Sequence, residues 1–133
     1  MKIVLASGKR KKSIARAVAR PGSGVIRVNK LLLDAVQPEA FRLKMREPLI
    51  LAGEHANSVD INVNVKGGGI SGQTDAVRLA IAKVLVGFTK DKKLEKTFLE
   101  YDRHMLVADV RQREARKPNT HGNARGKTQK SYR

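Results

Sequence analysis

The sequence predicts an α+β fold, in which helices pack on a mostly antiparallel sheet and a basic C-terminal tail extends from the domain. Two segments, 13–20 and 58–66, alternate between two kinds of side chain with the period of a strand. Between 73 and 88, apolar residues recur at helical spacing. From residue 111 onward large aliphatic residues are absent. We therefore expect residues 1–110 to form one globular domain and residues 111–133 to form the tail.

The first strands are expected near the N-terminus. Along 13–20, Ser and Ala occupy one face, and larger or charged residues occupy the other. Residues 21–24 read Pro-Gly-Ser-Gly, which is typical of a turn, and the short strand-like segment Val-Ile-Arg-Val follows at 25–28. This order predicts a hairpin over 13–28. A further short strand is expected at 2–6.

The clearest strand covers residues 58–66. Its odd-numbered residues from Val59 to Val65 are aliphatic, and its even-numbered residues from Asp60 to Lys66 are polar. We expect one face to be buried and the other to be wet, as in an antiparallel or edge-exposed sheet.

Three segments have helical spacing. Pro38 suits the first turn of a helix that Pro48 is expected to end or kink, and Gly53 closes the segment. A longer helix is expected from residues 73–74 to 88, and because apolar residues also lie off its main stripe, we expect it to be covered on more than one side. A shorter helix is expected from about 91 to 100.

The composition excludes several classes of protein. No apolar run approaches the ~20 residues of a membrane span. No apolar segment with a cleavage site begins the chain, so we expect no secretory signal. The sequence has no cysteine, which excludes disulfides, thiol catalysis and cysteine-ligated zinc and fits a reducing compartment. We therefore expect a cytoplasmic protein that does not bind a membrane.

The sequence nominates no catalytic centre. His55, His104 and His121 lack the spacing of metal ligands, and no nucleophile elbow or zinc-protease motif is present. The prediction is a protein that is not an enzyme and has no cofactor, metal or small-molecule substrate.

The net charge of +16 is concentrated at the two ends of the sequence. Nine basic residues and no acidic one precede Asp34, and the charges of residues 34–110 cancel. Residues 111–133 hold eight basic residues against Glu114 alone. This distribution indicates a polyanionic partner.

The basic run from Lys9 to Lys12 has three interpretations: a solvated loop, a nuclear address or a phosphate-binding segment. We favour phosphate binding, because Arg16, Arg20 and Arg27 continue the charge without acidic residues to pair them.

Gly67-Gly68-Gly69 separates the clearest strand from the long helix. One interpretation is a tight turn, and the other is a loop that contacts a nucleic-acid backbone with its N–H groups. The loop ends in Gly72-Gln73-Thr74 and is therefore not a nucleotide P-loop.

The tail carries the strongest compositional signal. Its excess of cations and its glycines favour a folded RNA as partner, and Tyr132 is placed to stack on a base. A solubilising or membrane-attracted tail is the alternative. For the whole chain, the alternative is a free-standing basic protein that binds DNA or an acidic protein.

Four stretches of the chain resemble the universal small-subunit ribosomal protein S-nine family, in its archaeal and eukaryotic form. They are residues 8–16 with Pro21–Gly24 and Val28-Asn29; Gly67–Gly69 with Gly72-Gln73, Ala76, Ala80, Ala82 and Lys83; Asp109–Arg111 with Glu114; and the terminal Gln129–Arg133. The chain departs from the family at residues 118–123, which hold fewer glycines than usual before Ala124-Arg125.

The resemblance implies a domain like the second domain of ribosomal protein S-five. It also implies binding to the head, or 3′ major, domain of small-subunit ribosomal RNA beside neighbouring head proteins, with the tail reaching the peptidyl-site tRNA. Candidate rRNA-binding residues are Lys9, Arg10, Lys11, Lys12, Arg16, Arg20, Gly67, Gly68, Gly69, Arg111, Arg113, Arg116, Lys117, Arg125 and Lys127. Candidate tRNA contacts are Lys130, Tyr132 and Arg133.

Overall fold

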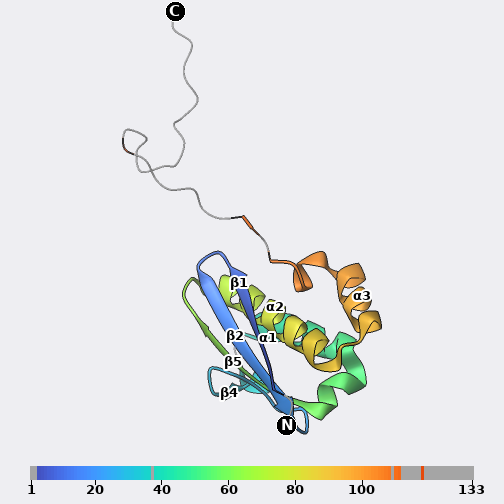
Figure 1. The fold of residues 1–133 in the computed structure, drawn as a ribbon. Helices are drawn as coiled ribbons and strands as arrows, with labels where there is room; N and C mark the ends of the chain where they lie inside the picture. The colour runs from blue at the N-terminus through green and yellow to red at the C-terminus, as the bar shows by residue number, and fades with distance from the viewer. Residues whose placement is uncertain (1–2, 37, 109, 112–117, 119–133) are drawn as a thin grey trace, which may run out of the picture.

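The computed structural model of the chain describes residues 3–36, 38–108, 110, 111 and 118, and they form two layers. A five-stranded sheet makes one layer, and helices cover one of its faces (Figure 1). The expected α+β class is confirmed. Because most of residues 111–133 lie outside the described residues, the division into domain and tail stays a prediction.

The sheet has the strand order β1-β2-β5-β3-β4. The strands are β1 (Val4–Arg10), β2 (Ser13–Pro21), β3 (Ile26–Val28), β4 (Leu31–Leu32) and β5 (Val59–Lys66). Neighbouring strands are antiparallel except β3 and β5, which run parallel. The sheet is therefore mixed but mostly antiparallel, as expected.

The predicted hairpin over residues 13–28 is wrong, because β5 lies between β2 and β3. The turn after β2 bonds to β5 instead of closing on itself: the backbone N–H groups of Ser23, Gly24 and Val25 donate to Oδ1 of Asp60 at 3.0–3.2 Å. The hairpin that does form joins β1 to β2. The first strand consequently extends to Arg10, beyond the segment 2–6 that was expected.

The two alternating segments face the core as their pattern requires. The Ser and Ala side of β2 is buried from Ser13 to Ala19, and the aliphatic side of β5 is buried from Val59 to Val65. The opposite sides are largely exposed. Small side chains on β2 leave room for a helix to lie close to the sheet.

The helices are α1 (Glu39–Ala52), α2 (Ile70–Thr89) and α3 (Lys92–Tyr101), with 3₁₀ turns η1 (Leu33–Ala35), η2 (Gly53–Ser58) and η3 (Arg103–Met105). The first helix runs past Pro48 and ends at its C-cap Gly53, so of the two expected effects of the proline, an end or a kink, the end is wrong, and the expected close at Gly53 is confirmed. The reason is tertiary: Pro48 and Ala52 are both buried against the core, and this packing maintains the last turn despite the missing N–H group.

The central helix α2 begins at Ile70, three residues earlier than expected. The backbone N–H of Gln73 donates to the carbonyl of Gly69 at 2.9 Å, and the hydroxyl of Thr74 donates to that of Ile70 at 2.8 Å. These two hydrogen bonds stabilise the first turn of the helix, where the sequence shows no helical spacing of apolar residues. Residues off the main stripe, such as Leu79 and Ala82, are buried too, which confirms that the helix is covered on more than one side.

Gly8 lets α2 approach β1. A Cβ atom on Gly8 would collide with the backbone oxygen of Ala76 and lie 2.8 Å from the backbone nitrogen of Ala80. The helix backbone therefore rests directly on the strand, and only glycine fits at this contact.

We expect Gly8→Ala to lower the free energy of unfolding by about 1–3 kcal/mol, because rigid backbone atoms must move to accept the methyl group. The control is Gly69→Ala, since Gly69 has a negative φ and a Cβ atom added to it would have no heavy atom within 4 Å. Urea unfolding of both variants measures the difference. Equal stability of the two variants would show that the helix is not seated this tightly.

Candidate nucleic-acid interface

The β1–β2 turn and the glycine loop lie side by side at one end of the sheet. Ser13, directly after Lys11 and Lys12, donates its hydroxyl hydrogen to the carbonyl of Gly67 at 2.8 Å. The register of β2 and β5 also pairs Ile14 with Lys66, the residue before the loop. The structure thus joins two segments that the sequence analysis singled out separately.

An open hollow of about 860 Å³ lies between these two segments. Lys11 and Lys12 line it from the turn, Gly68 and Gly69 line it from the loop, and Arg111 lines it from the C-terminal side. Figure 1 shows residues 110 and 111 at the same end of the domain as the β1–β2 turn. These five lining residues are called the loop-end surface below.

The three glycines of the loop differ in their structural role. Gly67 and Gly68 have φ values of +84° and +65°, and a Cβ atom on Gly67 would lie 2.5 Å from the carbonyl oxygen of Lys12. The tight turn therefore requires both of them. Gly69 has a φ of −98° and open space around it, so the fold itself does not require glycine there.

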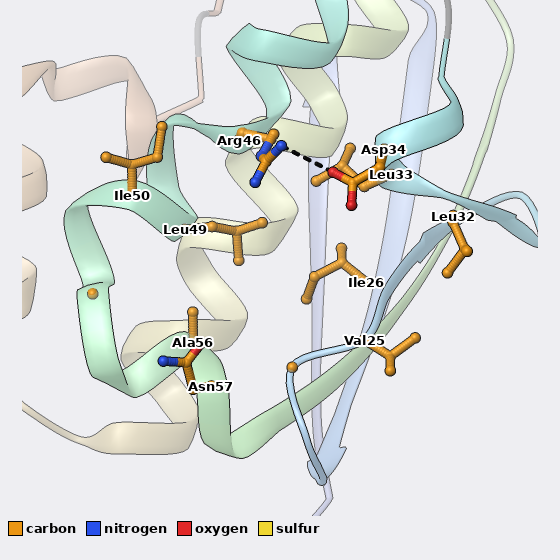
Figure 2. Close-up of a pocket in the computed structure, with 12 residues that line it drawn as sticks. Val25, Ile26, Leu32, Leu33, Asp34, Arg46, Leu49, Ile50, Ala56 and Asn57 are labelled. Carbon is orange, nitrogen blue, oxygen red and sulfur yellow. Dashed lines mark hydrogen bonds and ion pairs between the residues drawn. The ribbon is translucent and has the colours of Figure 1, made fainter.

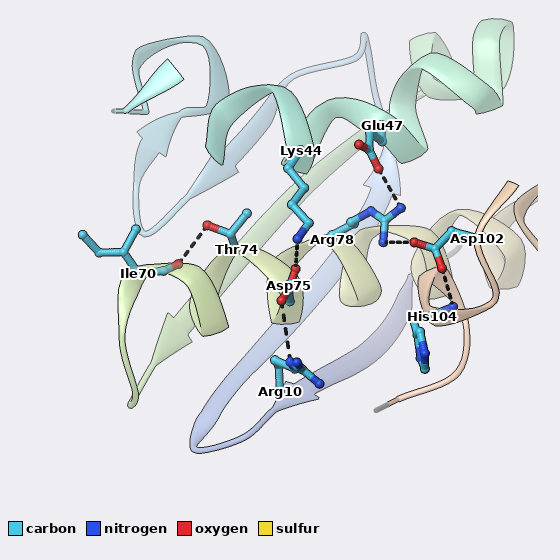
Figure 3. A network of polar contacts seen from close by, with 9 residues as sticks. All are labelled: Arg10, Lys44, Glu47, Ile70, Thr74, Asp75, Arg78, Asp102 and His104. Carbon is cyan, nitrogen blue, oxygen red and sulfur yellow. Dashed lines mark hydrogen bonds and ion pairs between the residues drawn. The ribbon is translucent and has the colours of Figure 1, made fainter. Parts of the chain in front are cut away.

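Arg10 differs from its neighbours in the basic run. Its Nε lies 3.6 Å from Oδ2 of Asp75 on α2, and its side chain is only 19% exposed. Nζ of Lys44 contacts the other oxygen of the same carboxylate at 2.6 Å (Figure 3). Although no acidic residue lies near Arg10 in the sequence, a distant helix supplies an acidic partner for it.

Arg78 is a buried cation that joins three helical segments. Its guanidinium lies 2.6 Å from a Glu47 oxygen on α1 and 3.0 Å from an Asp102 oxygen at the end of α3 (Figure 3). Partial burial raises the pKa of Asp102. Hydrogen bonds from the His104 backbone and from Arg78, together with the Arg78 charge, lower the pKa by more, so the pKa of Asp102 is lowered overall. Each charge here is held by an opposite one, as in a structural ion network.

Four further N-terminal cations, Lys9, Arg16, Arg20 and Arg27, lie on the face of the sheet that the helices leave open. Arg16, in the middle of β2, is opposite Ser7 and Asn64. Arg20 is opposite Asp60, eight residues and roughly 26 Å along the strand from Lys12. The structure therefore does not bring Arg20 to the loop-end surface. Lys9 points outward from β1.

Asp60, opposite Arg20 on the same face, already has partners for its charge. Hydrogen bonds from the backbones of Val25 and Ser23 lower the pKa of Asp60 most, and partial desolvation opposes them. The backbone of Gly24 and the charge of Arg27 lower it further. The carboxylate is thus used to hold the turn between β2 and β3.

A second hollow, of about 370 Å³, lies between α1 and the β3–β4 edge (Figure 2). Val25, Leu49 and Ile50 are among its lining residues, and an ion pair between Arg46 and Asp34 crosses it at 2.9 Å. None of the candidate site residues lines this hollow.

Ser13 is a residue of the interface that the sequence analysis did not select. It is fully buried, and its hydroxyl sets the distance between the basic turn and the glycine loop. The sequence did contain a signal for it, because Ser13 is the one polar residue on the strand face that Ala15, Ala17 and Ala19 form. A buried hydroxyl needs a partner, and that partner is the loop carbonyl.

Eight candidate residues lie outside the described residues, and their roles stay predictions: Arg113, Arg116, Lys117, Arg125, Lys127, Lys130, Tyr132 and Arg133. Within the described part, no group of three or more His, Asp or Glu side chains is arranged to hold a metal ion. No described helix has the length and apolar character to cross a membrane.

The fold and this surface define a class: a small α+β protein with structural ion pairs on its helical side and exposed cations at one end. A family model described as ribosomal protein S9/S16 matches residues 8–133. Proteins named small ribosomal subunit protein uS9 from Methanothrix thermoacetophila and Methanococcus maripaludis are 49% and 48% identical to the chain, over the full length of both. The chain belongs to this ribosomal protein family.

Membership in the family confirms the resemblance seen in the sequence. It makes the chain a structural, non-enzymatic constituent of the small ribosomal subunit that acts in translation in the cytoplasm.

Acid is expected to weaken the fold through Asp60. Because the folded state lowers its pKa, the charged carboxylate stabilises the protein above its unfolded pKa of about 3.9, and this contribution disappears as the pH falls through the folded value. In urea unfolding, wild type should exceed Asp60→Asn in stability by a constant amount above pH ~5, and the difference should shrink below pH ~4. A difference that does not change with pH would contradict this role.

Proposed function

We propose that the chain binds the 3′ major domain of small-subunit ribosomal RNA through its loop-end surface. The observation that carries the proposal is the convergence of Lys11, Lys12 and Arg111 with Gly68 and Gly69 around one hollow. The sequence resemblance supports the head domain as the particular RNA, since the family's basic run and glycine loop are both present here.

The chemistry of this surface suits phosphate groups. Lys11 and Lys12 are exposed on a tight turn and form no ion pair among the described residues. Binding a phosphate would therefore not break an existing ion pair. The first turn of α2 adds backbone N–H groups and the positive end of a 20-residue helix. Open space at Gly69 lets a sugar–phosphate backbone approach these groups closely.

We further propose that residues 111–133 form an extended basic tail that continues along the RNA to the peptidyl-site tRNA. Arg111, the first of the tail's cations, already lines the hollow, so the tail would begin on the RNA-binding surface. By position in the family's terminal motif, Lys130, Tyr132 and Arg133 are assigned to the tRNA.

The double variant Lys11→Ala/Lys12→Ala should bind a transcribed 3′ major domain at least tenfold more weakly and should lower the slope of log K against log salt by about 2, since two phosphate contacts are lost. The matched control is Lys92→Ala/Lys93→Ala, another exposed lysine pair, at the start of α3. Filter binding at several salt concentrations measures both. If the two double variants behave alike, total charge rather than the loop-end surface determines binding.

Two truncations test the tail. Removal of residues 111–133 should leave a folded domain whose rRNA affinity and salt slope are both reduced, because seven net positive charges are removed. Removal of only residues 130–133 should leave rRNA affinity nearly unchanged and lower the occupancy of tRNA in the peptidyl site of reconstituted subunits. Normal tRNA occupancy with the shorter truncation would exclude the tRNA contact.

A further inference from the structure

The side of the sheet away from the helices is open to solvent (Figure 1). The strand register aligns its polar side chains in adjacent rows: Arg16 is opposite Asn64, and Arg27 is opposite Asn62. The next rows hold Lys9 and Lys66, both opposite Ile14. The open sheet face is defined here by Lys9, Arg16, Arg27, Asn62, Asn64 and Lys66.

Several described carboxylates on the helical side form ion pairs with cations. Asp75 binds Arg10 and Lys44, and Arg78 lies between Glu47 and Asp102. The cations of these pairs are thereby held by carboxylates of the fold.

On the open sheet face, by contrast, cations outnumber carboxylates. Among the described outward side chains of its strands, Asp60 is the one carboxylate, and three backbone N–H groups already bind it. Lys9, Arg16, Arg27 and Lys66 form no ion pair within 4 Å among the described residues. A flat surface with four such cations is complementary to a polyanion.

The side chains also indicate which kind of polyanion fits. Proteins that bind single strands on a sheet stack the bases on aromatic residues, and none of these five strands contains one. Asn62 and Asn64 present exposed amides, which both donate and accept hydrogen bonds. Double-helical RNA offers phosphates for the cations and 2′-hydroxyls for the amides, and proteins recognise it by these groups rather than by its bases.

Two exposed apolar side chains also favour a partner that covers this face. Leu5 is 73% exposed and Ile14 is 42% exposed on the same side of the sheet. A partner lying on this face would remove apolar area from water while its phosphates meet the surrounding cations.

We propose that the open sheet face binds the backbone of a double-helical RNA segment, through phosphates at the four cations and 2′-hydroxyls at the two asparagines. The proposal rests on the proposed function, because it takes ribosomal RNA as the partner, and it adds a second surface distinct from the loop-end surface. The domain then contacts RNA on two sides, and the helical side is left outside the contact.

The test uses the full chain and a transcribed 3′ major domain of small-subunit rRNA. Asn64→Asp keeps the shape of the side chain and places a carboxylate opposite Arg16, so the fold is maintained while the face loses positive charge. Asn57→Asp, on an exposed asparagine of η2, is the matched control. We expect Asn64→Asp and Arg16→Ala to weaken binding about tenfold, with Asn57→Asp within twofold of wild type.

Hydroxyl-radical footprinting then locates the loss. Arg16→Ala should remove protection from a base-paired segment and retain the protection that depends on Lys11 and Lys12. If wild type does not bind this RNA, the proposed function itself fails. If wild type binds and the open-face variants keep its affinity and footprint, only the present inference is overturned.

Two other results overturn it in favour of a different partner. Protection lost only at single-stranded nucleotides would exclude the duplex. Unchanged RNA affinity together with lost binding of a neighbouring ribosomal protein during subunit assembly would make the face a protein-binding surface.

Discussion

The close packing of α2 on β1 and β2 is the constraint on which the rest of the structure depends. Small residues make it possible: Gly8 and Ala15 on the strands, and Ala76 and Ala80 on the helix, are all almost fully buried. Because the helix backbone rests on the sheet, the start of α2 comes out beside the β1–β2 turn. The Ser13 hydroxyl then ties that turn to the glycine loop. The same packing that stabilises the core thus positions the surface proposed to bind RNA.

Charge is sorted by layer in the described part of the domain. On the helical side, carboxylates hold cations such as Arg78 and Lys44 in ion pairs, which contribute to the fold. The four cations of the open sheet face, and Lys11 and Lys12 at the loop end, form no ion pair with a carboxylate among the described residues. In the described domain, carboxylates are therefore concentrated on the helical side, and the open sheet face is cationic. This separation lets one set of charges stabilise the structure while another set remains available to a polyanion.

Much of the fold could be predicted because it depends on local patterns. Alternation correctly identified the buried side of β2 and β5, and helical spacing identified α2 as a central helix. The predicted hairpin was wrong because the partner of a strand is decided by tertiary backbone hydrogen bonding and not by sequence order. Here Asp60 binds the turn after β2, and β5 lies between β2 and β3. Pro48 does not end α1 because the cost of the proline is offset by burial against the core, which helix propensity does not include.

The sequence by itself determined which residues form the strand faces, which segments are cationic, and which protein family the chain belongs to. These properties lie in residue type, period and motif, all of which are local. Only the tertiary structure decided which cations remain exposed and which segments share a surface. Arg10 is paired because Asp75 comes from another element, and Lys66 joins Arg16 on one face because β5 lies beside β2. Ion pairs and strand neighbours connect residues far apart along the chain, so the charge count along the sequence could not assign them.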